Sequence, residues 1–472
     1  MPAHSEQFGG FTAADSYSVL LLPLAKHTGI LRLSLLLLIV HVSRSASQCL
    51  TGNDNPGRMN PNSNSMLITA KLGFGLDALR KASEIEYQDN LFFSPHSLYE
   101  ALTLAYLGAR GTTEQSLKSA LQIPKELSKI DVRQVNAFEK AIKSLQMTNS
   151  TPTYEYESAN RLWISDQKKI KPCMLDIFSD ELKKTDFNTN PGAARDHINN
   201  WASEVTKGHI KDLIPTDGIT EDTDLVLTNA VYFKGQWRNR FDPKKSKPNI
   251  FYGSTNNSFV TFMKQKANFN HIVSEILGAH VLELPYNGSE ISMFILLPPA
   301  VTAQSVNNAD GQNATVNNDG IRQLINRMTN EEGGIQELRD ILENGMEQKE
   351  VEVSIPRFTI EKILPVTELL SAMGAGEILI PGKADLRGFL ENGEENLHLG
   401  DAIHRARIEL NEEGTTAAAV TALFSFRSSR PIGPVTFNAN HPFVYLIYDR
   451  VSKAILFNGV YRNGVETTDN KA

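Results

Sequence analysis

The run from Asp224 to Phe233 constrains the fold of this 472-residue chain more than any other segment. After Asp224 it reads Leu-Val-Leu-Thr-Asn-Ala-Val-Tyr-Phe, so nearly every position is apolar or β-branched. A run of this kind, without polar alternation, predicts a strand whose two faces are both covered by protein. The chain is therefore expected to fold around a sheet that is buried on both sides.

Helical patterns dominate before this strand, and strand patterns follow it. Apolar residues recur at spacings of three and four from Met66 to Ala82, which predicts a helix. The other expected helices cover 97–107, 113–121, 132–145 and 197–207. The other expected strands cover 280–285, 291–297, 351–360, 404–410, 435–437, 442–447 and 454–460. Helices first and mostly strands later predict an α+β fold in a single domain.

The ends of the chain and one internal stretch differ from this domain in composition. Residues 30–42 are almost wholly apolar and precede Ser45, Ala46 and Ser47, so 1–47 is expected to be a signal peptide with a long leader. An uncleaved signal anchor is the alternative. Residues 48–65 are expected to be a flexible segment, 66–464 the domain, 300–320 an exposed polar insertion without regular structure, and 465–472 a tail.

A secreted chain makes two kinds of modification possible. Cys49 and Cys173 can form a disulfide, although the sequence equally allows a free Cys49 that pairs between molecules. Glycosylation on exposed turns is expected at the Asn-x-Ser/Thr sequons, which begin at Asn149, Asn256, Asn287 and Asn313.

Signatures of catalysis are missing from the sequence. It contains no Gly-x-Ser-x-Gly, His-Glu-x-x-His, phosphate-loop or Cys-x-x-Cys motif, and its eleven histidines are scattered. The formal charge of −7 and the lack of a Lys/Arg block do not suggest a nucleic-acid binder. We therefore expect a protein that is not an enzyme and needs no metal or cofactor.

The segment from Glu412 to Ala422 is unusual because it has no large side chain beyond its two glutamates and no proline. Such a run is ordinarily a flexible linker. This one lies between strand-forming segments, and Val420 and Thr421 favour a strand. As a strand it would direct small side chains, beginning with Thr415, to one face. A strip of this kind could enter a sheet without burying a large group.

Several stretches of the sequence resemble the serpin family, from about Met66 to Gly464. The matching stretches are Asn90-Leu91-Phe92-Phe93-Ser94-Pro95-His96-Ser97, Leu107-Gly108-Ala109-Arg110-Gly111-Thr112-Thr113, Thr228-Asn229-Ala230-Val231-Tyr232-Phe233-Lys234-Gly235-Gln236-Trp237, the hinge stretch Asn411 to Val420, and His441-Pro442-Phe443. The resemblance implies three β-sheets, about nine helices and an exposed reactive loop over 412–434. A target protease attacks this loop, and the loop then inserts into the main sheet as a strand while the enzyme stays covalently attached.

The resemblance also implies roles for individual residues. The hinge comprises Glu412, Glu413, Gly414, Thr415, Thr416, Ala417, Ala418, Ala419 and Val420. Ser94, Ser97, Asn229 and His404 match the family's shutter, a polar cluster under the strands that open. Trp237 matches the tryptophan of the breach, where the loop enters. Glu412 and Arg357 match an ion pair between neighbouring strands.

The scissile bond is expected at Arg427-Ser428, because a trypsin-like protease binds arginine through an acidic group in its pocket. The usual count of fourteen residues past Gly414 favours Ser428-Ser429 instead, which would suit an elastase-like enzyme. The sequence leaves both bonds open.

The expected protein is a secreted, extracellular, monomeric serine-protease inhibitor whose partner is trypsin-like or elastase-like, without membrane or nucleic-acid partners. The alternative is a non-inhibitory serpin that acts as a carrier or binding protein. Glycosaminoglycan binding is not expected, because acidic residues dilute Lys125, Lys129, Arg133, Lys140 and Lys143 around the relevant helix.

Overall fold

Helices gather mostly in the N-terminal part of the chain, as the sequence predicts. The computed structural model describes residues 49–50, 60–149, 154–300, 304–307, 313–316, 320–392, 396–413 and 434–465. Its α-helices within these ranges are α2 Ser63–Ile85, α3 Pro95–Gly108, α4 Gly111–Ala120, α5 Lys129–Asn149, α6 Pro172–Ile177, α7 Pro191–Val205, α8 Gly320–Asn330, α9 Glu332–Asn344 and α10 Val366–Ala372. None of these described helices is long and apolar enough to cross a bilayer.

The strands form a five-stranded sheet, a nine-stranded sheet and a separate two-stranded sheet. The five-stranded sheet has the order β12 Phe358–Leu364, β13 Asp401–Leu410, β4 Leu225–Gly235, β2 Tyr154–Ser165 and β3 Leu182–Thr185. The nine-stranded sheet has the order β1 Leu91–Phe93, β16 Ala454–Tyr461, β15 Phe443–Asp449, β8 Ile291–Leu297, β7 Ala279–Pro285, β6 Asn257–Ser274, β11 Gln348–Pro356 and β14 Val435–Asn438, with β5 Lys247–Tyr252 paired to β6. Sheets and helices together confirm the predicted α+β class.

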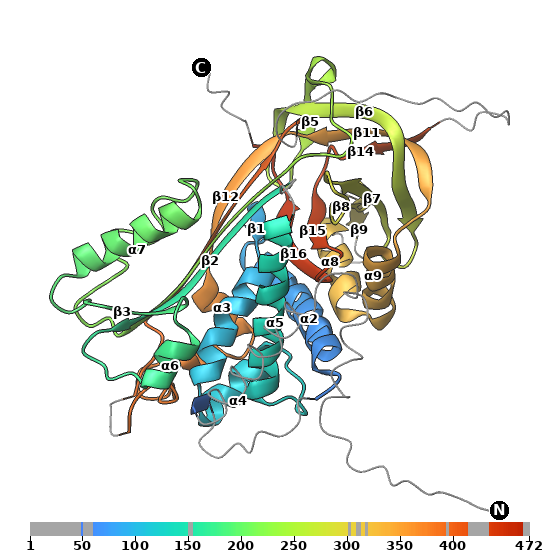
Figure 1. Ribbon diagram of the computed structural model, residues 1–472. Coiled ribbons are helices and arrows are strands. Elements are labelled where there is room, and N and C mark those ends of the chain that lie inside the picture. The colour runs from blue at the N-terminus through green and yellow to red at the C-terminus, as the bar shows by residue number, and fades with distance from the viewer. Residues whose placement is uncertain are drawn as a thin grey trace, which may run out of the picture.

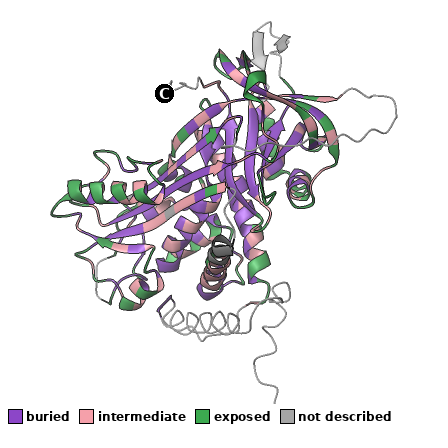
Figure 2. Cartoon of the chain, turned by 45° about the horizontal axis from the view of Figure 1, so that its top comes forward, coloured by how far each residue is buried: buried purple, intermediate pink, exposed green. Residues whose placement is uncertain are grey.

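Strand β4 is the central strand that the sequence predicts, and all of its residues except Lys234 are buried. Its side chains alternate between the two faces of the sheet, which pack against different apolar clusters. Leu225 and Leu227 belong to the cluster that includes α2 and α3, whereas Val226 and Ala230 belong to the cluster that includes α7. Figure 1 shows α7 and α3 on opposite sides of this sheet, and Figure 2 shows the buried strands between them. Both faces are therefore covered, as the unbroken apolar run requires.

Three segments for which the sequence makes a definite prediction differ from it. The strand expected over 351–360 is divided at Arg357, so that β11 joins the nine-stranded sheet and β12 joins the five-stranded one. The alternation changes phase at the division, from Val351, Val353 and Ile355 to Phe358 and Ile360, and Pro356 stands between the two halves. The sequence therefore carries a signal of the break, which the expectation of one strand overlooked. Within the polar insertion at 300–320, β9 Gln304–Asn307 pairs with β10 Asn313–Val316, so the expectation of no regular structure is wrong there.

The N-terminal segment at 48–65 is also more ordered than expected where it is described. Cys49 and Leu50 are buried, and α2 already begins at Ser63. Cys49 forms a disulfide with Cys173 of α6, with 6.1 Å between their Cα atoms. The structure therefore selects the intramolecular disulfide over the free Cys49 that the sequence left open.

Candidate functional site

The chain leaves the five-stranded sheet directly after β13, at the end of that sheet next to β14 (Figure 1). The carbonyl oxygen of Asn411 accepts a hydrogen bond from Trp237 Nε1 at 2.9 Å. The carbonyl oxygen of Glu412 accepts one from the Phe241 amide at 3.0 Å. The predicted pair is also present, since Arg357 Nη1 lies 3.6 Å from Glu412 Oε2. These contacts hold Asn411 and Glu412 in place where the hinge begins.

Trp237 is buried at the point where β4 ends. Its ring stacks on Tyr286 with 4.5 Å between the centroids, and the two residues form an isolated β-bridge. Because its indole N–H donates a hydrogen bond to the carbonyl oxygen of Asn411, Trp237 joins the end of β4 to the end of β13. The role of Trp237 as the breach tryptophan stays a prediction of the resemblance.

Strands β4 and β13 pair directly and run parallel, from Asp401 opposite Val226 to Ile408 opposite Phe233. Every other pair in this sheet except β2 with β3 is antiparallel. A strand that continued from β13 by turning back would run antiparallel to both β13 and β4. It would replace one parallel ladder by two antiparallel ladders, which are slightly more stable per residue. The parallel seam between β4 and β13 is therefore suited to accept one more strand.

The shutter residues predicted from the sequence meet beneath this seam. The Ser94 side chain caps α3 by accepting a hydrogen bond from the Ser97 amide at 3.1 Å, and Pro95 follows at the first helical position. The Ser94 amide donates to His404 Nε2 at 3.0 Å, and Asn229 Nδ2 donates to Ser97 Oγ at 2.6 Å. His404 Nδ1 is also bonded to Asn229 Oδ1. The four residues thus connect the N-terminus of α3 to both strands of the seam.

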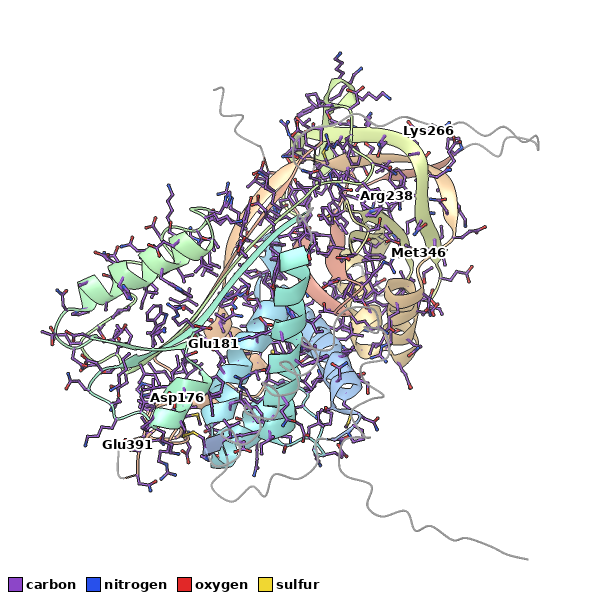
Figure 3. All side chains as sticks on the ribbon, viewed as in Figure 1. Asp176, Glu181, Arg238, Lys266, Met346 and Glu391 are labelled. Carbon is purple, nitrogen blue, oxygen red and sulfur yellow. A yellow bond between two sulfur atoms is a disulfide. The ribbon has the colours of Figure 1, made fainter. Side chains whose placement is uncertain are left out.

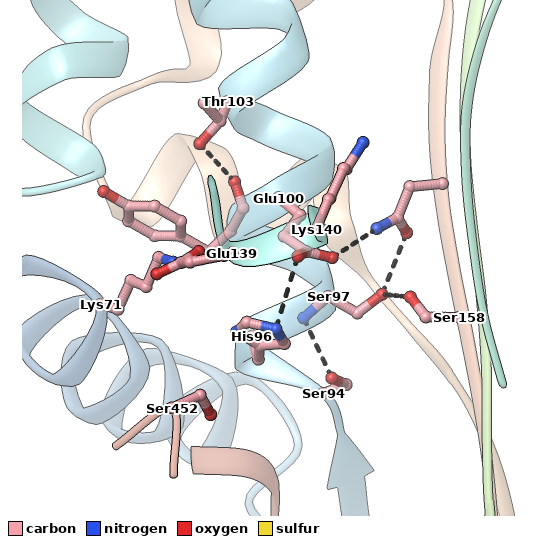
Figure 4. Close-up of polar contacts among 12 residues, drawn as sticks. Lys71, Ser94, His96, Ser97, Glu100, Thr103, Glu139, Lys140, Ser158 and Ser452 are labelled. Atoms are coloured by element: carbon pink, nitrogen blue, oxygen red, sulfur yellow. Dashed lines mark hydrogen bonds and ion pairs between the residues drawn. The ribbon is translucent and has the colours of Figure 1, made fainter. Parts of the chain in front are cut away.

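Two further members of this cluster come from β2 and were not predicted. Ser97 Oγ lies 2.8 Å from Ser158 Oγ and donates to Asn160 Oδ1 at 3.0 Å, and Asn160 in turn bonds Glu100 of α3. Figure 4 shows Ser94, Ser97 and Ser158 on one side of α3, facing the sheet. The sequence could have suggested them only through the alternation in Tyr154–Ser165, which places Ser158 and Asn160 on one face.

His404 is completely buried, and burial lowers its pKa to about 3. Since Nε2 accepts a hydrogen bond from the Ser94 amide, the neutral ring carries its proton on Nδ1 and donates it to Asn229. A second proton would remove the acceptor at Nε2 and place an uncompensated charge between the two strands. Folding therefore favours the neutral ring.

We expect the shutter to weaken in acid. An unfolded histidine titrates near pH 6.5, so the stability due to neutral His404 is complete above about 6.5 and is lost as pH falls toward 3. With a native pKa of about 3, the loss reaches about 3 kcal/mol at pH 4. Urea unfolding at pH 7 and pH 4 measures this loss for the unmodified chain and for His404→Gln. The free energy of unfolding should fall less between the two pH values in the variant.

His271 needs a separate control, because burial lowers its pKa to about 4 as well and the same pH range affects it. His271→Gln should reduce the acid loss independently, since His271 lies on β6, outside the seam. Equal acid losses in the unmodified chain and in His404→Gln would contradict the assignment to His404.

The hinge from Gly414 onward and both candidate scissile bonds, Arg427-Ser428 and Ser428-Ser429, lie outside the described residues. The structure resumes at Pro434, and Val435 of β14 pairs with Val351 of β11 in the nine-stranded sheet. The two anchors of this segment therefore belong to different sheets.

Three of the five basic side chains named around α5 make ion pairs or hydrogen bonds with other residues of the protein. Lys129 is buried and lies 2.9 Å from Glu114, Arg133 donates to the Ile177 carbonyl oxygen at 3.0 Å, and Lys140 pairs with Glu181. These contacts leave less charge for an external polyanion than the sequence alone suggests. Among the described residues no cluster of metal-ligating side chains is present.

Comparisons with known proteins agree with this geometry. The family model described as serpin (serine protease inhibitor) matches residues 69–464. Serine protease inhibitor 88Ea of Drosophila melanogaster is 34% identical over 413 residues, which cover 84% of this chain and 90% of that protein. The leukocyte elastase inhibitor of Xenopus laevis is 32% identical over 402 residues, which cover 84% and 98%.

Solved structures show the same fold. A tumour-suppressing serpin superposes with a TM-score of 0.69 at 23% identity, covering 84% of this chain and 99% of that one. Serpin-12 of Manduca sexta gives a TM-score of 0.68 at 22% identity, covering 84% and 99%. With a family model over most of its length and relatives above 30% identity, the chain belongs to the serpin family.

Proposed function

We propose that this serpin is a secreted, extracellular inhibitor of a trypsin-like serine protease and that it acts as a suicide substrate. The serine hydroxyl of the target adds to the carbonyl carbon of Arg427, and the amine of Ser428 leaves with the proton. The resulting ester joins the enzyme to the loop. Residues 414–420 then enter the five-stranded sheet and carry the enzyme with them.

The observation that carries this proposal is the parallel seam between β4 and β13 together with the sequence that follows β13. The seam can accept one antiparallel strand, and the next residues after Glu413 are small. A large or charged side chain in that run would oppose insertion, because burying it costs several kcal/mol. Relatives named as serine protease and leukocyte elastase inhibitors support the same class of activity.

The test is incubation with trypsin and, separately, with an elastase. We expect a trypsin complex that survives boiling in detergent, and a released C-terminal peptide that begins with Ser428 in mass spectrometry. A peptide that begins with Ser429 would move the scissile bond to Ser428-Ser429 and favour an elastase-like target. Complete cleavage without any covalent complex would contradict inhibition.

One cavity among the described residues bears on the non-inhibitory alternative of a small-ligand carrier. A cavity of about 200 Å³ lies between α2, α9 and the β15–β16 end, lined by Ser65, Leu72, Arg339, Leu342 and Tyr448 among others. Sites for small ligands usually enclose about 300–1,000 Å³.

Cleavage of the loop distinguishes the inhibitory form from the non-inhibitory one. An inhibitory form should melt at a much higher temperature after its loop is cut, and a non-inhibitory form should not.

A further inference from the structure

An exposed apolar face lies on the outer hairpin of the nine-stranded sheet, where β5 pairs with β6. Ile250 stands opposite Phe259, and Tyr252 stands opposite Asn257, so these four side chains share one face. Tyr252 is 50% exposed and Phe259 is 67% exposed, while Ile250 is half-buried. We call Ile250, Tyr252 and Phe259 the hairpin apolar face.

This face is unusual because the rest of the hairpin buries its large apolar residues. Phe251, Val260 and Phe262, on the opposite face of the same two strands, are 4% exposed or less. Single exposed apolar side chains are common, but a group of them on one sheet face, such as two aromatic rings and an isoleucine, usually marks a surface that another molecule covers. The exposure of the Tyr252 and Phe259 rings is therefore the feature to be explained.

One of the sequons begins at Asn256 in the turn that joins β5 to β6 and continues into β6 with Asn257 and Ser258. Asn256 is exposed, and the turn is held in place because Asn463 Oδ1 accepts hydrogen bonds from the Thr255 amide at 3.0 Å and from its hydroxyl at 2.9 Å. Phe259 follows Asn256 by three residues and lies two residues after the start of β6, about 10 Å from Asn256. Tyr252 lies closer still to Asn256, because it pairs with Asn257, the next residue in the chain. A sugar chain on Asn256 would begin at the edge of the hairpin apolar face.

We propose that Asn256 is N-glycosylated and that the first sugars of its glycan cover the hairpin apolar face. Pyranose rings have an apolar face of C–H groups that packs on aromatic rings, whose faces are electron-rich. The glycan also keeps the two rings away from other protein molecules. This inference rests on the proposed secretion, because the modification occurs only in the secretory pathway.

The sequon at Asn287 provides a matched control within the same chain. Asn287 is also exposed and also lies in a hairpin turn, between β7 and β8. Its aromatic neighbour, Tyr286, is buried against Trp237 instead of exposed. A glycan on Asn287 would therefore have no aromatic face to cover.

The experiment uses the full chain secreted from eukaryotic cells behind a heterologous signal peptide, so that its outcome does not depend on the chain's own leader. Glycopeptide mass spectrometry measures occupancy at Asn256, and binding of the hydrophobic dye bis-ANS measures exposure of the rings. We expect Asn256 to be occupied and Asn256→Gln to bind at least three-fold more dye. Asn287→Gln should leave dye binding unchanged, and adding Tyr252→Ser and Phe259→Ser to Asn256→Gln should abolish the increase.

An unoccupied Asn256, or an occupied Asn256 whose loss does not change dye binding, overturns the proposal. A glycosylated chain that forms dimers sensitive to Phe259→Ser overturns it too, because a second copy would then be the occupant. Covalent complex formation with trypsin is measured on the same samples and should not depend on Asn256. Failure of the glycan proposal is thereby distinguished from failure of the inhibitory function.

Discussion

Replacing Thr415 by glutamate should convert the inhibitor into a substrate. The loop would still be cut, but the covalent trypsin complex that survives boiling should fall more than ten-fold. Thr415 is the first small residue after Gly414 and shares its face with Ala417 and Ala419 in an extended chain. On insertion this carboxylate would enter the sheet between the buried strand β4 and the face of β13 that carries buried Ile408 and Leu410, where an unpaired charge costs several kcal/mol. Hydrolysis of the acyl bond then outpaces insertion.

Thr416→Glu is the matched control, because it introduces the same charge one position later, on the opposite face of the strand. We expect this variant to keep at least half of the complex formed by the unmodified chain. The readout is the ratio of complex to cleaved inhibitor on a denaturing gel at several molar ratios. Equal losses in the two variants would show that charge in the hinge matters but that the inward face does not.

Elements of the fold could be predicted where one periodicity continues through the whole element. The unbroken apolar run placed β4 at the centre of the sheet, and the three- and four-residue spacing placed α2 to within three residues at each end. Strands β2 and β6 could not be predicted in this way. Strand β6 buries Val260 and Phe262 on one face and then Met263 and Phe269 on the other, because it pairs with different neighbours along its length.

Prediction of the candidate site had a similar limit. Motifs that form local structure, such as the Ser94-Pro95 cap and the residues that flank Trp237, identify their positions directly. The contacts of Ser97 with Ser158 and Asn160 join residues about sixty positions apart and depend on the packing of α3 on β2. No local pattern records such a pairing, so only the fold brings the complete cluster together.

The disulfide between Cys49 and Cys173 should have the largest effect on stability. It closes a loop with a sequence separation of 124 residues. In the chain-entropy model, opening such a loop costs about 5 kcal/mol, because the unfolded chain gains freedom. For a domain of this size that corresponds to a melting temperature lower by about 5 °C. Differential scanning calorimetry of Cys49→Ser/Cys173→Ser compared with the unmodified chain measures this change.

The surroundings of the disulfide predict an effect on the folded state as well. Leu50 accepts a hydrogen bond from Arg110 at 2.6 Å, and the Arg110 amide donates to the Asp385 carbonyl oxygen at 2.9 Å, so Cys49 is held on the α3–α4 corner. Nearby, Ile170 forms a β-bridge with Leu390 just before α6. Figure 3 shows Asp176 of α6 and Glu391 at the same end of the molecule. These contacts place the disulfide at the end of the five-stranded sheet opposite the breach, and we expect it to act there as a clamp.

Opening the seam between β4 and β13 for one more strand requires these strands to move apart by about 4.8 Å. A clamp at the far end opposes this movement, so the serine double variant should convert faster, without protease, to a heat-resistant inserted form at 45 °C. Arg110→Met is the matched control, because it removes the contact with Leu50 but keeps the disulfide, and it should accelerate conversion less. A lower melting temperature with an unchanged conversion rate would place the whole effect in the unfolded chain and contradict the clamp.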